Sequence, residues 1–154
     1  MNYLKDKEIH NICEKYGIKN YTVNTDGSIG VDGDVDLSNK RLTKIPLKFN
    51  NVSGYFLCYY NELTTLLGSP KSVGGNFYCS SNKLTTLEGG PKSVGGNFRC
   101  SFNKLTTLEG CPRPLVGDFD CYDNPIHDKL GDIDYKSYIK QLNRDKILNE
   151  LLNR

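Results

Sequence analysis

The chain has 154 residues, which is the length of one domain. Its 20 basic and 18 acidic residues nearly cancel, so the sequence gives no sign of the clustered basic face typical of nucleic-acid-binding proteins. No apolar run approaches the roughly 18 residues of a membrane-spanning helix, and the charged first residues lack the apolar core of a secretory signal. We therefore expect a cytoplasmic protein that contacts neither nucleic acid nor membrane.

Residues 1–20 are predicted to form an N-terminal helical cap. Gly17 is a typical helix end. The apolar residues that follow helical spacing here are Leu4, Ile9, Ile12, Cys13 and Tyr16. A partner-binding helix is the alternative, but a repeat array needs its open end closed, which favours the cap. The next segment, Tyr21 to Val31, is consistent with a hairpin that turns at Asp26-Gly27.

Residues 21–127 are organised around one repeated stretch. Phe77–Leu87 recurs 21 positions later as Phe98–Leu108, and more loosely 21 positions earlier as Phe56–Leu66. A fixed period of this length is the signature of a solenoid, in which each turn stacks on the next. We expect about five turns of 21 residues.

Apolar residues recur in the same register and predict a continuous core. The columns are Val35, Phe56, Phe77, Phe98, Phe119; Leu37, Cys58, Cys79, Cys100, Cys121; Leu42, Leu63, Leu84, Leu105, Ile126; Ile45, Leu66, Leu87, Leu108; and Val31, Val52, Val73, Val94, Leu115. Proline resists sheet interiors, and Pro70, Pro91 and Pro112 lie on the return path. Each turn is therefore predicted to be one short strand plus an irregular return, giving one parallel sheet.

A polar column accompanies the core: Asn61, Asn82, Asn103 and Asn124. A buried amide at this position can bond the backbone where each turn leaves its strand. The four column cysteines are interpreted as reduced core thiols, because free cysteine is among the most buried residue types. Disulfides between neighbouring turns are the alternative, and zinc is disfavoured because no closely spaced cysteine pair is present. Cys111 lies at a turn position, where we expect an exposed thiol.

Residues 128–154 are predicted to form a C-terminal helix that starts near Asp132, since acidic residues favour helix N-termini. Tyr135, Tyr138, Ile139 and Leu142 form one apolar stripe that can cap the solenoid. An offset stripe follows at Ile147, Leu148, Leu151 and Leu152. The helix is interpreted as a structural cap, with a homodimer through the second stripe as the alternative.

The pattern Phe-x-Cys-x-x-Asn-x-Leu resembles the core of the leucine-rich repeat. More closely, residues 103–121 resemble the repeat phrase of small leucine-rich-repeat-like proteins encoded by tailed bacteriophages. The resemblance covers about residues 21–127. It implies a leucine-rich-repeat-like solenoid, a phage origin and a role in the cytoplasm of the infected host.

The strand residues between the core columns vary from turn to turn and are expected to face the concave surface. The candidate protein-binding residues are Tyr55, Leu57, Tyr59, Tyr78, Arg99, Asp120 and Tyr122. Tyr and Arg dominate interface hot spots, although aromatics also favour strands for local reasons. We find no catalytic motif, no metal site and no cofactor motif, because neither His10 nor His127 accompanies a recognisable nucleophile.

The sequence therefore predicts a non-catalytic module that binds a host protein, for example to inhibit a defence or regulatory factor. One alternative is a protein that sequesters a small nucleotide-like ligand, which would need a concave pocket with convergent donors. A minor alternative is a structural component of the virion.

Overall fold

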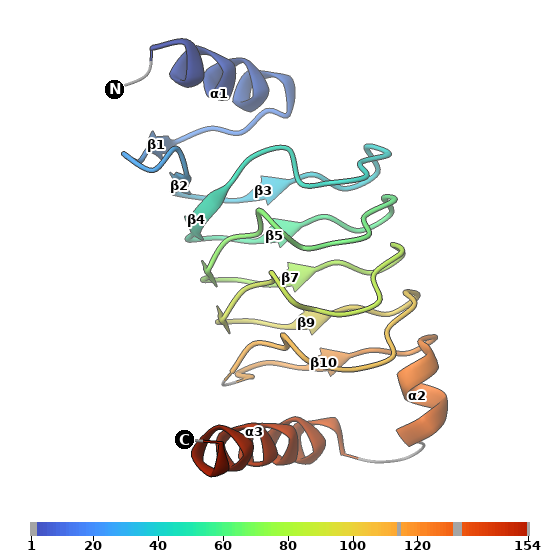
Figure 1. Ribbon diagram of the computed structural model, residues 1–154. Coiled ribbons are helices and arrows are strands. Elements are labelled where there is room, and N and C mark those ends of the chain that lie inside the picture. The colour runs from blue at the N-terminus through green and yellow to red at the C-terminus, as the bar shows by residue number, and fades with distance from the viewer. Residues whose placement is uncertain (1–2, 114, 131–133, 154) are drawn as a thin grey trace.

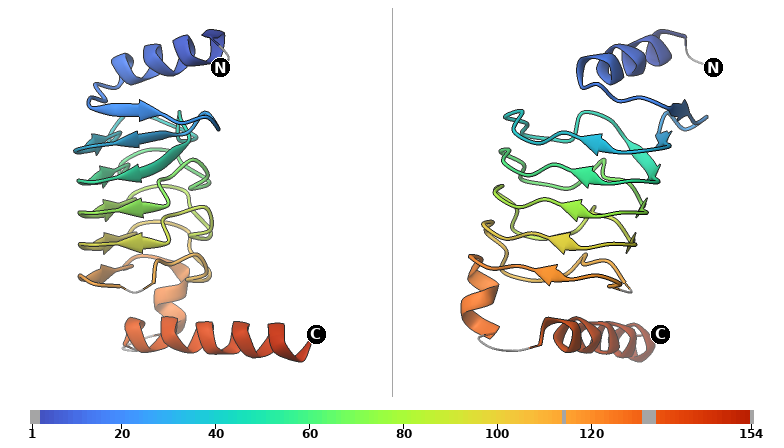
Figure 2. Two further views of the ribbon diagram at one scale, coloured as in Figure 1. Left: turned by 90° about the vertical axis from the view of Figure 1, so that its left-hand side faces the viewer. Right: turned by 180° about the vertical axis from the view of Figure 1, so that it is seen from behind.

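The computed structural model describes residues 3–113, 115–130 and 134–153 and consists of a β-solenoid with a helix across each end (Figure 1). The solenoid has about four turns of parallel strands. Helix α1, Tyr3–Lys15, lies across the first turn, and helix α3, Tyr135–Leu152, lies across the last (Figures 1 and 2). A short helix, α2, spans Pro125–Leu130 and leads from the last turn to α3.

The strands of successive turns form two sheets, and both sheets are built from very short strands. The first sheet, called sheet A, contains β1 (Tyr21–Val23), β2 (Ile29–Val31), β4 (Phe49–Val52), β6 (Ser72–Val73) and β8 (Ser93–Val94). The second sheet, called sheet B, contains β3 (Val35–Asp36), β5 (Phe56–Leu57), β7 (Phe77–Tyr78), β9 (Phe98–Arg99) and β10 (Phe119–Asp120). The predicted β1–β2 hairpin is antiparallel, and the other strand pairs among the described residues are parallel.

The prediction of one sheet is wrong, because the valine column also forms strands. Val52 pairs with Val73, and Val73 pairs with Val94, in parallel register. Each of these strands buries one side chain, so no alternation of polar and apolar residues marks it in the sequence. The expected number of turns, about five, is not confirmed.

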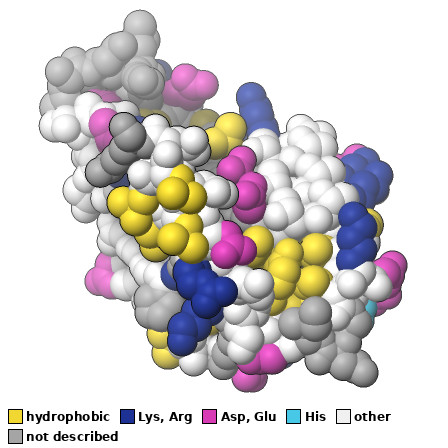
Figure 3. All heavy atoms as spheres, turned by 60° about the horizontal axis from the view of Figure 1, so that its bottom comes forward, with side chains coloured by type: hydrophobic (Ala, Val, Ile, Leu, Met, Phe, Trp, Pro, Cys, Tyr) yellow, Lys and Arg dark blue, Asp and Glu magenta, His cyan; other side chains and the backbone are white. Residues whose placement is uncertain are grey.

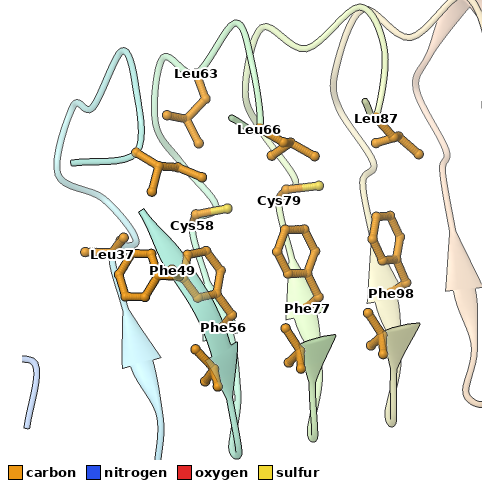
Figure 4. Close-up of a cluster of buried hydrophobic side chains, with 14 of the residues drawn as sticks. Leu37, Phe49, Phe56, Cys58, Leu63, Leu66, Phe77, Cys79, Leu87 and Phe98 are labelled. Carbon is orange, nitrogen blue, oxygen red and sulfur yellow. The ribbon is translucent and has the colours of Figure 1, made fainter. Parts of the chain in front are cut away.

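The core is a stack of side chains that repeats with each turn (Figure 4). The rings of Phe56, Phe77 and Phe98 are fully buried and stacked, with centroids 5.5 and 5.2 Å apart. Phe49 adds an unpredicted ring, packed edge-on against Phe56 with centroids 5.1 Å apart. Burial of several such apolar side chains per turn, at about 1.5–3 kcal/mol each, is the main driving force for stacking the turns.

Buried asparagines satisfy the backbone where each strand ends, as the sequence predicts. The Asn82 side-chain oxygen accepts the Leu63 N–H at 2.9 Å. Its amide nitrogen donates to the carbonyl oxygens of Cys58 and Cys79 at 2.9 and 3.1 Å. Asn61, Asn103 and Asn124 make the corresponding bonds. Each amide therefore joins its own turn to the preceding one.

Paired glycines let the backbone turn sharply between the two sheets. A Cβ atom on Gly74 would lie 2.1 Å from the carbonyl oxygen of Ser53, and one on Gly95 would lie 2.2 Å from that of Gly74. Stacked corners approach too closely for any side chain, so these glycines fix the spacing of the turns.

The terminal helices cover the ends of the core through a few buried residues. Ile9 and Cys13 of α1 and Ile139 of α3 are buried against it, whereas the Leu4 side chain lies outside the described residues. The predicted single C-terminal helix is two helices, because the chain starts a new helix at Pro125, where proline is well suited to the first helical position. Asp132 lies outside the described residues, and Asp134 precedes α3 and accepts a hydrogen bond from the Ser137 hydroxyl. None of the described helices is long and apolar enough to cross a membrane.

All six cysteines are free and buried, in agreement with the interpretation of the column cysteines as reduced core thiols. The expectation of an exposed thiol at Cys111 is wrong, because only 6% of this residue is exposed. Burial raises the pKa of the thiols of Cys79, Cys100 and Cys111. Such thiols are poor nucleophiles, since the reactive form is the thiolate.

Replacing Asn82 with alanine should destabilise the protein strongly. The substitution leaves the Leu63 N–H and the Cys58 carbonyl without this partner in a buried place, at about 1–3 kcal/mol for each group. Urea unfolding followed by circular dichroism measures the loss. Asn51→Ala, at an exposed position of sheet A, is the control and should change stability by no more than about 0.5 kcal/mol. Equal effects of the two substitutions would contradict this role of the amide column.

Candidate functional site

The outer faces of the two sheets differ in composition although they belong to the same turns. On sheet A the outward residues of successive turns are small and polar: Asn51, Ser72 and Ser93. On sheet B the corresponding residues are more varied and include larger ones: Asp36, Leu57, Tyr78, Arg99 and Asp120. Strand propensity acts on both sheets and cannot account for the difference between their outward residues. The outer face of sheet B is therefore the candidate binding surface.

A shallow groove of about 410 Å³ lies on this face, and we refer to it as the sheet B groove. Its lining includes five of the residues predicted from the sequence: Leu57, Tyr59, Tyr78, Arg99 and Asp120. It also includes Tyr60, Ser80, Ser81, Ser101 and Phe102. The predicted residues Tyr55 and Tyr122 do not line it.

Tyr55 and Tyr122 have other surroundings. The Tyr55 ring covers Gly75, where an added Cβ would meet the ring at 2.4 Å, so this tyrosine fills space at the corner between the sheets. The Tyr122 ring packs edge-on against His127 with centroids 5.1 Å apart. Their roles in binding stay predictions.

Arg99 is held in place by its neighbours on the strand face. Its guanidinium carbon lies 5.0 Å from the centroid of the Tyr78 ring, which is within the range of a cation–π contact. The Tyr78 hydroxyl accepts a hydrogen bond from the Asn76 amide at 3.0 Å, and this bond fixes the ring. The guanidinium is thus oriented by an aromatic ring, while its N–H groups keep their capacity to bind a ligand.

Backbone strain marks the rim of the groove. One position of the 21-residue repeat has a left-handed backbone with φ between 51° and 56°: Asn39, Tyr60, Ser81, Phe102 and Asp123. Asn and Asp adopt this conformation readily, whereas a bulky residue there is strained. Tyr60 and Phe102 are nevertheless 63% and 59% exposed, so core packing does not explain their presence. Strain of this kind is often retained at functional sites.

The sequence analysis did not select Tyr60 and Phe102, because both follow the residues expected to form the strand. The strands of sheet B end at Leu57, Tyr78 and Arg99, and the chain then bends. The bend turns the column of Tyr60, Ser81 and Phe102 toward the groove. Its position immediately before the asparagine column was the available signal.

Two larger depressions lie elsewhere on the surface. One, of about 670 Å³, holds Lys92 and Arg113 beside Glu88 and Glu109, so the two acidic side chains would repel a phosphate group that the two basic ones attract. The other, of about 650 Å³, lies along α3 between Ser137 and Leu148. Its two cations, Lys140 and Arg144, lie exposed on the surface of one helix.

One histidine joins α1 to the solenoid, and the other joins α2 to α3. His10 of α1 contacts the Tyr21 hydroxyl at 2.5 Å, and His127 of α2 contacts the Tyr135 hydroxyl of α3. Burial raises the pKa of the Tyr135 hydroxyl above its ordinary value. Among the described residues, no three His, Cys, Asp or Glu side chains gather closely enough to hold a metal ion.

The second apolar stripe of α3 is exposed. Ile147, Leu148, Leu151 and Leu152 each leave about half or more of their area to solvent, up to 80% for Leu152. Figure 3, viewed toward the α3 end of the molecule, shows exposed hydrophobic patches separated by acidic and basic side chains. These residues extend α3 beyond the part that packs on the core, which ends near Leu142.

Comparison with known proteins gives no relative: no family model, no curated protein and no solved structure matches the chain. The arguments for a function therefore rest on the groove itself.

Replacing Tyr60 or Phe102 with asparagine should stabilise the protein. Each substitution removes a strained left-handed bulky residue, and the expected gain in unfolding free energy is about 1 kcal/mol. Thermal and urea unfolding measure it. Tyr55→Asn is the control, because Tyr55 lacks the left-handed backbone and its ring covers Gly75. A loss of stability in both test variants would show that the two rings serve packing.

Proposed function

We propose that the chain is a non-catalytic protein-interaction module that binds a host protein through the outer face of sheet B. The resemblance of its repeats to leucine-rich-repeat-like phage proteins leads us to propose also that a tailed bacteriophage encodes it and that it acts in the host cytoplasm. We propose that the host protein is a defence or regulatory factor and that binding inhibits it.

The observation that carries the proposal is the contrast between the two outer faces. The inward residues repeat in both sheets, but only sheet B combines variation, aromatic rings, a supported arginine and strained exposed residues. Tyr and Arg are enriched among residues that dominate interface energies. A flat, open groove of this kind favours a protein surface over a small ligand, which is usually enclosed on most sides.

A pull-down from bacterial host lysate tests the proposal. The wild type should retain a host protein that the variant Tyr59→Ala, Tyr78→Ala, Arg99→Ala loses, because these three side chains line the groove. The matched control, Lys71→Ala, Lys92→Ala, Ser93→Ala, changes exposed residues on and beside sheet A and should retain it. Circular dichroism must show that both variants are folded. Retention of the protein by both variants would contradict the use of sheet B.

We also propose that the exposed stripe of α3 mediates a homodimer. The proposal is supported by its four exposed apolar side chains, which a second copy of the same stripe would cover. Light scattering should give twice the 17.3 kDa chain mass for the wild type and the single mass for Leu148→Lys, Leu151→Lys. A single mass for both proteins, at concentrations of about 0.1 mM, would exclude a stable dimer.

A further inference from the structure

We propose that the sheet B groove binds an extended acidic peptide segment of the partner protein, with one carboxylate on Arg99 and one aromatic side chain between Tyr60 and Phe102. The inference rests on the proposed function and specifies the chemistry of the partner. Three features of the groove lead to it: an arginine without an acidic partner, a gap in a column of exposed rings, and a balance of charge that suits a single carboxylate.

The first feature is the electrostatic state of Arg99. In the part of the chain that the structure describes, the two ion pairs are Lys48–Asp26 and Lys83–Glu62, and neither involves this arginine. Asp120 is in register with Arg99 on the neighbouring strand, and its Oδ1 accepts a hydrogen bond from the Tyr122 N–H at 3.2 Å. The guanidinium lies over the Tyr78 ring and is exposed, and the planar fork of its N–H groups matches a carboxylate.

The second feature is a notch at Ser81. Tyr60, Ser81 and Phe102 occupy one position in three successive turns, so a short side chain separates two exposed rings. Turns stack about 4.8 Å apart, which places the backbone of Tyr60 roughly 10 Å from that of Phe102. An aromatic ring halfway between them would lie about 5 Å from each, within the usual range for aromatic pairs.

The floor of the groove also offers polar groups to a bound main chain. Ser80, Ser81 and Ser101 lie there between the rings. The Ser101 hydroxyl is buried, with 4% of the residue exposed, and has no hydrogen-bond partner among the described residues. A buried hydroxyl without a partner costs free energy, and a small movement toward an incoming amide or carbonyl would relieve it.

The third feature is the charge of the groove, which favours a single carboxylate over nucleic acids and nucleotide phosphates. Arg99 is its single cation and Asp120 its single anion, so the lining carries no net positive charge. Nucleic acids and nucleotide phosphates need several cations in one place, whereas one carboxylate needs one guanidinium. Arg99 and Phe102 are three residues apart and the chain bends between them, so their backbones lie at most about 10 Å apart, and the acidic and aromatic residues of the peptide should lie about two to four positions apart.

Fluorescence polarisation with labelled synthetic peptides tests this inference. The panel places one aspartate and one phenylalanine at about two to four positions apart in a glycine–serine background. Companion peptides carry lysine in place of aspartate, or alanine in place of phenylalanine. The wild type should bind the acidic aromatic peptide at least about tenfold more tightly than either companion.

Two variants of the protein assign the two contacts. Arg99→Glu should reverse the charge preference and bind the lysine peptide more tightly than the acidic one. Phe102→Asn, which is expected to be more stable than the wild type, should bind the phenylalanine and alanine peptides equally. Lys92→Glu, outside the groove, should behave as the wild type.

Several results would overturn the inference. These are no saturable binding of any panel peptide, equal binding of acidic and lysine peptides by the wild type, or an unchanged charge preference in Arg99→Glu. If the pull-down still finds a host protein that depends on sheet B, only the peptide chemistry is wrong. If that dependence is also absent, the proposed function fails as well.

Discussion

The whole structure depends on a constraint that operates between turns: each turn must complete the backbone hydrogen bonding of its neighbour. Within the short strands, the hydrogen bonds between parallel strands pair the backbone N–H and C=O groups. Beyond the end of each strand, backbone N–H and C=O groups lie outside this pairing. The buried asparagine amides meet that need, with one oxygen and one nitrogen bridging two turns. Because the amide must fall at the same place in each turn that uses it, the asparagines from Asn61 to Asn124 keep a strict spacing of 21 residues.

A fixed period makes the inward side chains repetitive and leaves the outward ones free. Phe56, Phe77 and Phe98 stack because each ring rests on the ring of the next turn. A change at one of them affects both neighbours, so the core tolerates little variation. The outward residues of sheet B touch the core very little, and they can differ between turns without cost to the fold. The scaffold thereby offers a surface whose chemistry is set independently of its shape.

The sequence predicts those parts of the fold in which one residue type recurs with the period. The phenylalanine, cysteine and asparagine columns gave the core, the reduced thiols and the amide ladder, and the Asp26-Gly27 turn gave the first hairpin. Sheet A was missed because each of its later strands shows a single buried valine. The burial of Cys111 was missed because it depends on how the return path packs, which the columns do not specify. In the candidate site, the residues on the strands were predicted, whereas the rim formed by Tyr60 and Phe102 depends on a backbone bend that only the three-dimensional structure reveals.

The near identity of adjacent turns also affects how such a chain can change over generations. The segment Pro70–Phe77 is identical in sequence to Pro91–Phe98, so each of the two turns presents the same groups to its neighbours here. Unequal recombination between the two coding segments would therefore add or remove a complete turn and leave every amide, ring and glycine corner with a suitable neighbour. The terminal helices would still meet the same kind of surface, since they contact only the first and last turns. The length of the groove, and with it the length of whatever lies along it, can thus change in steps of one turn while the fold stays the same.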